Sequence, residues 1–135
     1  MAMEILEGKK QVELEGSIHG VKFRGYADAV GVGRVVDLKT SQDASPDAFK
    51  RQAWNLMYHL QAAIYMKLTN AQEFYWVVVE NSAPYNVSVY AASKDFILKG
   101  EELLQDLCER FKWWDGSPQG YSENIELLTL PNWVK

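Results

Sequence analysis

Short runs of alternating polar and apolar positions fill the first forty residues, and this pattern predicts strands. Alternation runs from Val12 to His19, and β-branched residues are frequent from Val21 to Val30 and from Arg34 to Thr40. Gly31-Val32-Gly33 separates the last two runs. Glycine tolerates the positive φ of a tight turn, so we expect the second and third strands to form a hairpin.

A helical period follows the three strands. Ser45 suits an N-cap and Pro46 the first helical position. Apolar residues then recur at steps of three and four, at Phe49, Ala53, Leu56, Leu60, Ile64 and Leu68. This spacing predicts one amphipathic helix of about six turns that ends near Thr69-Asn70.

The second half repeats the change from strands to a helix. The elements that we expect are a buried strand from Glu73 to Glu80, a turn over Asn81 to Pro84, a strand from Tyr85 to Ala91, and a helix capped by Ser93 that runs to about Trp114. The order βββ-α-ββ-α predicts a mixed sheet flanked by two helices, in the α/β or α+β class.

A break at Asp115-Gly116-Ser117-Pro118 is expected to end the last helix. The tail from Gln119 to Lys135 carries Tyr121, Ile125, Leu127, Leu128, Leu130 and Trp133. It is too apolar for a free tail, so we expect it to pack on the body or on another chain.

Composition narrows the function classes. A chain of 135 residues with 47% hydrophobic residues predicts one globular domain over residues 1–135. A net charge of −4 argues against a non-specific nucleic-acid coat but not against a nuclease, whose metal-binding carboxylates are themselves negative. The single Cys108 excludes an internal disulfide and a cysteine-based metal cluster within one chain. No run has the length of a membrane span and no signal-peptide core is present, so we expect a cytosolic protein.

Two acids and a lysine fall in or beside the predicted hairpin strands. Asp28 ends Gly25-Tyr26-Ala27-Asp28, and Asp37 and Lys39 lie in Val35-Val36-Asp37-Leu38-Lys39-Thr40. The hairpin brings both carboxylates and the ammonium to one end. Hard oxygen ligands favour Mg²⁺ or Mn²⁺, and a lysine suits water activation or phosphate binding. This set predicts metal-dependent phosphodiester hydrolysis, although most acid-x-lysine triplets are solvated strand ends.

The predicted first helix carries a second group. Trp54, Tyr58, Gln61 and Tyr65 step by four, three and four, which places them in one stripe beside the apolar face. An amphipathic border explains such a stripe. The functional alternative is that Gln61 and Tyr65 reach the end of the hairpin and contact a phosphate or position Lys39.

Together these motifs resemble a known superfamily. Gly25-x-x-Asp28, Asp37-Leu38-Lys39-Thr40 and Gln61-x-x-x-Tyr65 are similar to the PD-(D/E)xK nucleases, RecB-like branch. Further segments resemble the phage RecE-type exonucleases (exodeoxyribonuclease VIII): Phe49 with residues 58–65, residues 79–87, and Leu130-Pro131-Asn132-Trp133. The resemblance implies a restriction-endonuclease-like core.

It also implies roles for the site. Asp28 and Asp37 would bind Mg²⁺, with Mn²⁺ as the alternative, and the Leu38 carbonyl would complete the shell. Lys39 would orient or help deprotonate the attacking water, with Gln61 and Tyr65 as auxiliary residues. The implied activity is digestion of linear duplex DNA from its ends, which leaves a 3′ single-stranded tail for a partner annealing protein. A ring-like homo-oligomer encoded by a phage or prophage is implied too.

One departure from the family concerns the N-terminus. Family members carry a longer helical portion with a His or Glu that approaches the metal, whereas about ten residues precede the first strand here. A minimal version, a fragment and a trimmed form stay open. His19 and Glu15 are the nearest replacements, and we interpret neither as a ligand.

Three functions remain as hypotheses. The leading one is a metal-dependent exonuclease. The others are an endonuclease of repair or restriction type and a DNA-binding or assembly subunit that kept the fold without cutting, since fold alone does not separate these.

Overall fold

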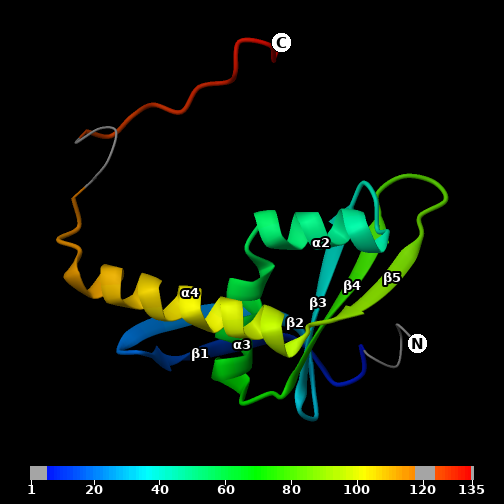
Figure 1. Ribbon diagram of the computed structural model, residues 1–135, viewed down its shortest axis with the longest axis horizontal. Helices are drawn as coiled ribbons and strands as arrows, with labels where there is room; N and C mark the ends of the chain where they lie inside the picture. The colour runs from blue at the N-terminus through cyan, green and yellow to red at the C-terminus, as the bar shows by residue number, and fades with distance from the viewer. Residues whose placement is uncertain (1–5, 118–123, 135) are drawn as a thin grey trace.

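The computed structural model describes residues 6–117 and 124–134, in the order βββ-αα-ββ-α (Figure 1). The strands are β1 (Lys9–Ile18), β2 (Val21–Gly31), β3 (Arg34–Ser41), β4 (Glu73–Glu80) and β5 (Val87–Ala91). The helices are α2 (Pro46–Asn55), α3 (Tyr58–Thr69) and α4 (Lys94–Trp113). The mixed sheet and the α+β class are confirmed.

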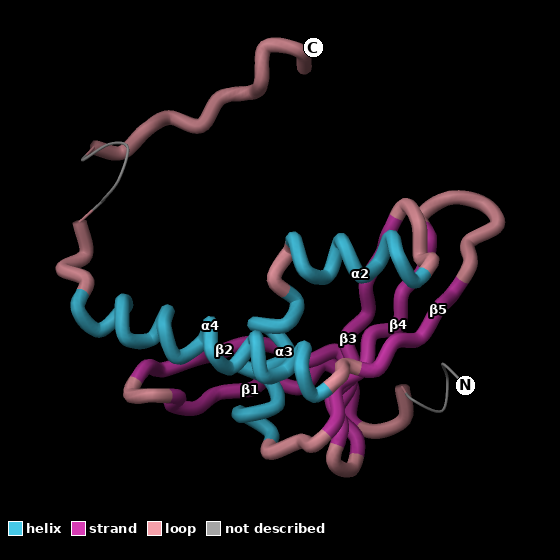
Figure 2. The backbone as a smooth tube through the Cα atoms, in the orientation of Figure 1, coloured by secondary structure: helices cyan, strands magenta, loops and turns pink. Residues whose placement is uncertain are grey.

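The five strands lie side by side in sequence order. β3 pairs with β4 in parallel, from Arg34 beside Glu73 to Ser41 beside Glu80, and the other neighbours are antiparallel. A parallel pair needs a long crossover, and α2 and α3 supply it (Figure 2). β3 is therefore the central strand and presents residues 37–39 between β2 and β4.

The helices pack on one face of the sheet. The main core joins Leu14, Ala27, Val35, Phe49, Ala53, Ala62, Phe74, Trp76 and Val78. A second cluster of Ile18, Ala63, Leu104 and Cys108 lies where α3 and α4 meet β1 and β2. On the other face, Ala29, Val36 and Val77 form a small cluster that contains no helical residue. The site strands are thus held from both faces.

The long helix expected from Phe49 to Leu68 is in fact two helices. α2 ends at Asn55, and Met57 takes left-handed φ and ψ of 57° and 41° before α3 begins. Trp54 therefore lies on a different helix from Tyr58, Gln61 and Tyr65, and the single four-residue stripe was a wrong prediction. The left-handed conformation of Met57 redirects the chain, and Trp54 of α2 then stacks on the buried His59 of α3 with ring centroids 4.6 Å apart.

The described part of the tail does not pack on the body. Residues 124–134 extend away from the sheet and helices (Figure 1), and Ile125 and Leu128 are 95% and 97% exposed. Of the two expectations for this segment, packing on its own domain is wrong for residues 124–134. Tyr121 lies outside the described residues.

Gly100 makes the close crossing of α3 and α4. A Cβ there would lie 2.0 Å from the His59 carbonyl oxygen, which belongs to the backbone and cannot turn away. Helix propensity alone would make Gly100→Ala stabilising by about 1 kcal/mol. We predict the opposite sign, a loss of about 2–3 kcal/mol, because the helices must separate. Urea unfolding followed by circular dichroism measures it.

Gln105→Ala, at an exposed position of the same helix, is the control and should change stability by less than about 0.5 kcal/mol. A Gly100→Ala protein as stable as wild type would show that the two helices do not cross so closely.

Candidate active site

The candidate site begins with an interruption of the sheet at Asp28. The ladder between β1 and β2 pairs Lys10 with Ala29 and Val12 with Ala27 but omits the pair between them. The ladder between β2 and β3 stops at Ala29 and Val36, one pair before Asp28 would face Asp37. Ala27 packs under the helices and Ala29 on the opposite face, so side-chain alternation is broken at Asp28.

The Asp28 carboxylate enters the gap that results. Its Oδ2 accepts a hydrogen bond of 2.8 Å from the Leu38 N–H. The Asp28 side chain thus accepts the Leu38 N–H, which has no partner in the β2–β3 ladder, so the interruption has little energetic cost. The Asp28 carboxylate is held beside the strand that carries Asp37 and Lys39.

Asp37 and Lys39 form the buried half of the site. Asp37 is only 5% exposed, and its Oδ2 lies 2.8 Å from Lys39 Nζ. Burial raises the pKa of Asp37 to about 6 in spite of the nearby ammonium, and the neighbouring Asp28 carboxyl adds to the rise. The sequence prediction that a hairpin gathers Asp28, Asp37 and Lys39 agrees with this geometry.

The donor set fits a hard divalent cation. Asp37 Oδ2 is buried and, although it pairs with Lys39, receives no hydrogen bond of acceptable geometry within the described residues. Carboxylate oxygens are the ligands that Mg²⁺ and Mn²⁺ prefer, and the Asp37 oxygen has a lone pair available for such an ion. No third His, Cys, Asp or Glu joins them within residues 6–117 and 124–134. The remaining ligands would be the Leu38 carbonyl, water or substrate.

Sequence reasoning missed the surroundings of Lys39. Its Nζ lies 4.4 Å from the ring centroid of Tyr58, the first residue of α3. The Tyr58 hydroxyl accepts a hydrogen bond of 3.1 Å from Gln52 Nε2. Ser41 Oγ donates to Gln52 Oε1 at 2.6 Å. Tyr58 was part of the predicted stripe, but spacing could not single it out from Tyr65.

The two auxiliary candidates lie on α3. The Tyr65 hydroxyl lies against Gly25 of β2, where a Cβ would be only 3.0 Å from it, so the glycine makes room for the ring. Gln61 is half-buried. Neither side chain hydrogen-bonds to Asp28, Asp37 or Lys39 in the part of the chain that the structure describes. Their roles stay predictions.

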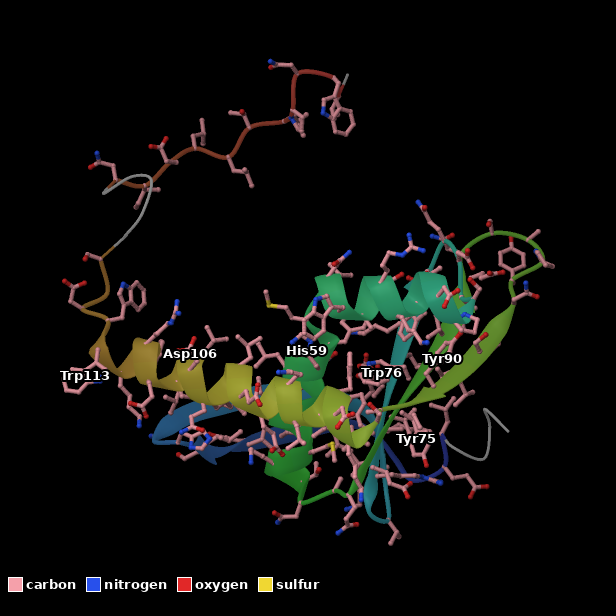
Figure 3. All side chains as sticks on the ribbon, viewed as in Figure 1. His59, Tyr75, Trp76, Tyr90, Asp106 and Trp113 are labelled. Carbon is pink, nitrogen blue, oxygen red and sulfur yellow. The ribbon has the colours of Figure 1, made fainter. Side chains whose placement is uncertain are left out.

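The histidines and Glu15 lie elsewhere. His19 occupies the β1–β2 turn with φ 50°, and Glu15 is exposed on β1, opposite Arg24. His59 is 4% exposed, stacks on Trp54 and has a pKa lowered by burial, as expected of a packed core residue (Figure 3).

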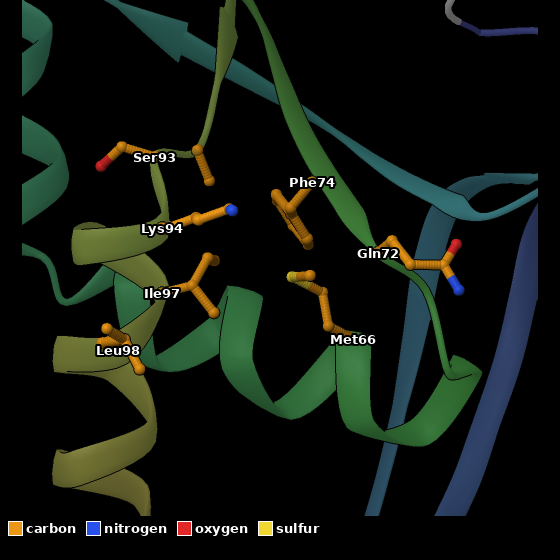
Figure 4. Close-up of a pocket in the computed structure, with 8 residues that line it drawn as sticks. Met66, Gln72, Phe74, Ser93, Lys94, Ile97 and Leu98 are labelled. Atoms are coloured by element: carbon orange, nitrogen blue, oxygen red, sulfur yellow. The ribbon is translucent and has the colours of Figure 1, made fainter.

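Two surface hollows of the described residues do not include the acids. Figure 4 shows Met66, Phe74 and Ile97 around one of them, with Lys94 at its edge. Another lies between α2, the end of β5 and α4, lined by Phe49, Trp54, Trp76, Tyr90 and Phe96. The candidate site lies instead where the pairing of β2 with its neighbouring strands is interrupted.

Comparisons with known proteins identify the family and the fold. A family profile described as a PDDEXK-like domain of unknown function (DUF3799) matches residues 1–131. The fold is similar to that of a presumed exonuclease from Eubacterium rectale, with TM-score 0.69 and 18% identity over 82% of this chain and 46% of that one. It is also similar to a phage-related exonuclease from Haemophilus somnus 129PT, with TM-score 0.51 and 16% identity over 77% and 61%.

This chain therefore spans about half the length of the Eubacterium rectale protein. The comparison with curated proteins found no match.

The raised pKa of Asp37 has a consequence for stability. The folded state keeps a proton up to about pH 6 that the unfolded chain loses near 3.8, so the free energy of unfolding should fall as pH rises through this window. Asp37→Asn removes the ionisable group and with it this decrease in the free energy of unfolding. In EDTA at pH 7.5 we predict that the variant is more stable than wild type by about 1–3 kcal/mol.

Urea unfolding at several pH values measures this difference. Asp106→Asn, at an exposed position of α4, is the control and should leave the pH slope unchanged. A wild-type stability that is flat between pH 4 and 6, or an Asp37→Asn protein less stable at pH 7.5, would contradict the burial argument.

Proposed function

The chain belongs to the PDDEXK-like family DUF3799, and from that premise we propose that it is a metal-dependent deoxyribonuclease that hydrolyses phosphodiester bonds of DNA. The observation that carries the proposal is the grouping of Asp28, the buried Asp37 and Lys39 at the interruption of the sheet. A buried carboxylate oxygen without a hydrogen bond of acceptable geometry, and the Lys39 ammonium in contact with it, suit a site that receives both a metal ion and a phosphate.

In this proposal, Asp28, Asp37 and the Leu38 carbonyl hold Mg²⁺, or Mn²⁺ in its place. When bound, such an ion supplies Lewis-acid stabilisation of the phosphate and lowers the pKa of a coordinated water. Lys39 donates hydrogen bonds from Nζ that orient the attacking water or a phosphate oxygen. Gln61 and Tyr65 are auxiliary residues on the neighbouring helix.

We infer action on the ends of linear duplex DNA. The two similar structures are described as exonucleases, which supports this choice over an endonuclease. The product would carry a 3′ tail for a single-strand annealing protein, in phage-type recombination in the bacterial cytoplasm. No helix within residues 6–117 and 124–134 is long and apolar enough to cross a membrane.

Cleavage of DNA tests the proposal directly. With Mg²⁺, we predict that wild type degrades end-labelled linear duplex but not closed circular duplex, and that EDTA stops the reaction. Lys39→Ala should lower kcat by about 100-fold or more, because proton transfer and charge stabilisation are lost. Lys99→Ala, which removes an exposed lysine of α4, is the matched control and should cut normally.

Other outcomes select the alternatives. Cutting of closed circular duplex would favour an endonuclease. DNA binding with no Mg²⁺-dependent cutting would favour a subunit that kept only the fold.

The second part of the proposal is a homo-oligomer. Leu107, Phe111, Trp113 and Trp114 at the end of α4 are exposed, as are the apolar residues of 124–134. Large exposed apolar surfaces mark interfaces. Light scattering at tens of micromolar should give at least twice the mass of the 15.4 kDa chain.

Leu128→Glu should reduce that mass, whereas Thr129→Glu, its exposed polar neighbour, should not. A single 15.4 kDa species from wild type would contradict the oligomer.

A further inference from the structure

We propose that Tyr58 is the positioning residue for Lys39, and that the aromatic ring of Tyr58 holds the Lys39 ammonium in place when Asp37 binds a metal ion. This inference rests on the proposed nuclease function. It assigns to Tyr58 a role that neither the motif spacing nor the family description contains.

The contact itself comes first. Lys39 Nζ lies 4.4 Å from the centre of the Tyr58 ring, within the distance at which an aromatic face attracts a cation. The Lys39 side chain is about one-fifth exposed, so the contact is partly shielded from water. A lysine has four rotatable bonds, and two fixed partners, the ring and Asp37, restrict them.

The ring is fixed relative to the strand that carries Lys39. Asp37, Lys39 and Ser41 alternate along β3 and so share its helix-facing side. From Ser41, hydrogen bonds of 2.6 Å and 3.1 Å lead through Gln52 to the Tyr58 hydroxyl. The contacts thus form a closed loop from β3 through α2 and α3 back to β3.

The helix break makes this loop. In one continuous helix, Gln52 and Tyr58 would be six residues apart and would point to different sides of the axis. The left-handed Met57 turns the chain so that both side chains meet. The break that separates α2 from α3 thereby serves the site.

The two partners of Lys39 are not equivalent. The Asp37 oxygen that pairs with Lys39 is also an oxygen with which this carboxylate can bind a cation. A metal ion bound by this carboxylate would share its negative charge with Lys39 and would so weaken the ion pair. The ring of Tyr58 does not bind Mg²⁺ and takes no N–H of the ammonium in a conventional hydrogen bond. Lys39 stays in place with its donors free for water or phosphate.

Three variants separate positioning from packing, since Tyr58 also touches the main core. Tyr58→Leu removes the aromatic face and Tyr58→Phe keeps it. Trp54→Leu is the matched control, because Trp54 is a half-exposed aromatic of α2 that contacts His59 rather than Lys39. Cleavage kinetics on linear duplex give kcat and KM, and NMR of the Lys39 ε-methylene protons reports the ring contact through their ring-current shift.

We expect upfield-shifted Lys39 ε-protons in wild type and Tyr58→Phe, both in EDTA and at the Mg²⁺ concentration used for cleavage. In Tyr58→Leu the shift should be lost and kcat should fall about tenfold or more with KM for DNA within about twofold. Tyr58→Phe loses the link to Gln52 but keeps the ring and its packing, with Phe49 at a centroid distance of 6.0 Å, so it should keep kcat within about threefold. Trp54→Leu should match wild type in both measurements.

Two results would overturn the inference alone: loss of the ring-current shift when Mg²⁺ is added to wild type, or an undiminished kcat in folded Tyr58→Leu. If Tyr58→Leu does not fold, a Tyr58→Phe protein with kcat reduced about tenfold would overturn it as well. Wild-type protein that does not cut DNA would overturn the proposed function, and this inference with it.

Discussion

The site depends on one hydrogen bond: the Asp28 carboxylate accepts the Leu38 N–H in place of a backbone partner from the neighbouring strand. Asp28 is omitted from both of its ladders and accepts the Leu38 N–H instead. The strands can part there without leaving that donor unsatisfied. With the ladder continued, Asp28 would lie opposite Asp37 in the β2–β3 pairing, and its carboxylate would not replace a backbone partner of Leu38.

The rest of the fold buries the charged groups at this interruption. β3 is central, the main core lies under one face and the small cluster of Ala29, Val36 and Val77 under the other, so Asp37 has little contact with water. The pKa of Asp37 is raised because burial disfavours the charged carboxylate. An arrangement that costs stability and persists is typical of a functional site, where a bound ligand offsets the cost.

Much of this could be predicted from the sequence, and the failures have physical causes. Alternation and β-branched runs indicated the strands, and the Ser93 cap, whose hydroxyl accepts the Phe96 N–H, indicated α4. The break at Met57 was missed because the apolar period continues through Leu56 and Leu60 with no Gly or Pro. The contacts of Tyr58 were missed for the same reason, since the break at Met57 turns Tyr58 toward Lys39 and Gln52. The sequence around Asp28 does not predict the interruption of the sheet either. Strand propensity does not indicate where a side chain replaces a backbone hydrogen bond between two strands.

A metal ion held between Asp28 and Asp37 is open to direct measurement by Mn²⁺ titration of the ¹⁵N-labelled protein, followed by NMR. Paramagnetic broadening falls off steeply with distance from the ion. We expect the amide signals of Asp28, Asp37 and Leu38 to disappear first, at substoichiometric Mn²⁺, and Asp37→Asn to abolish this selectivity. Broadening that begins elsewhere in the chain, or that is the same in Asp37→Asn, would contradict it.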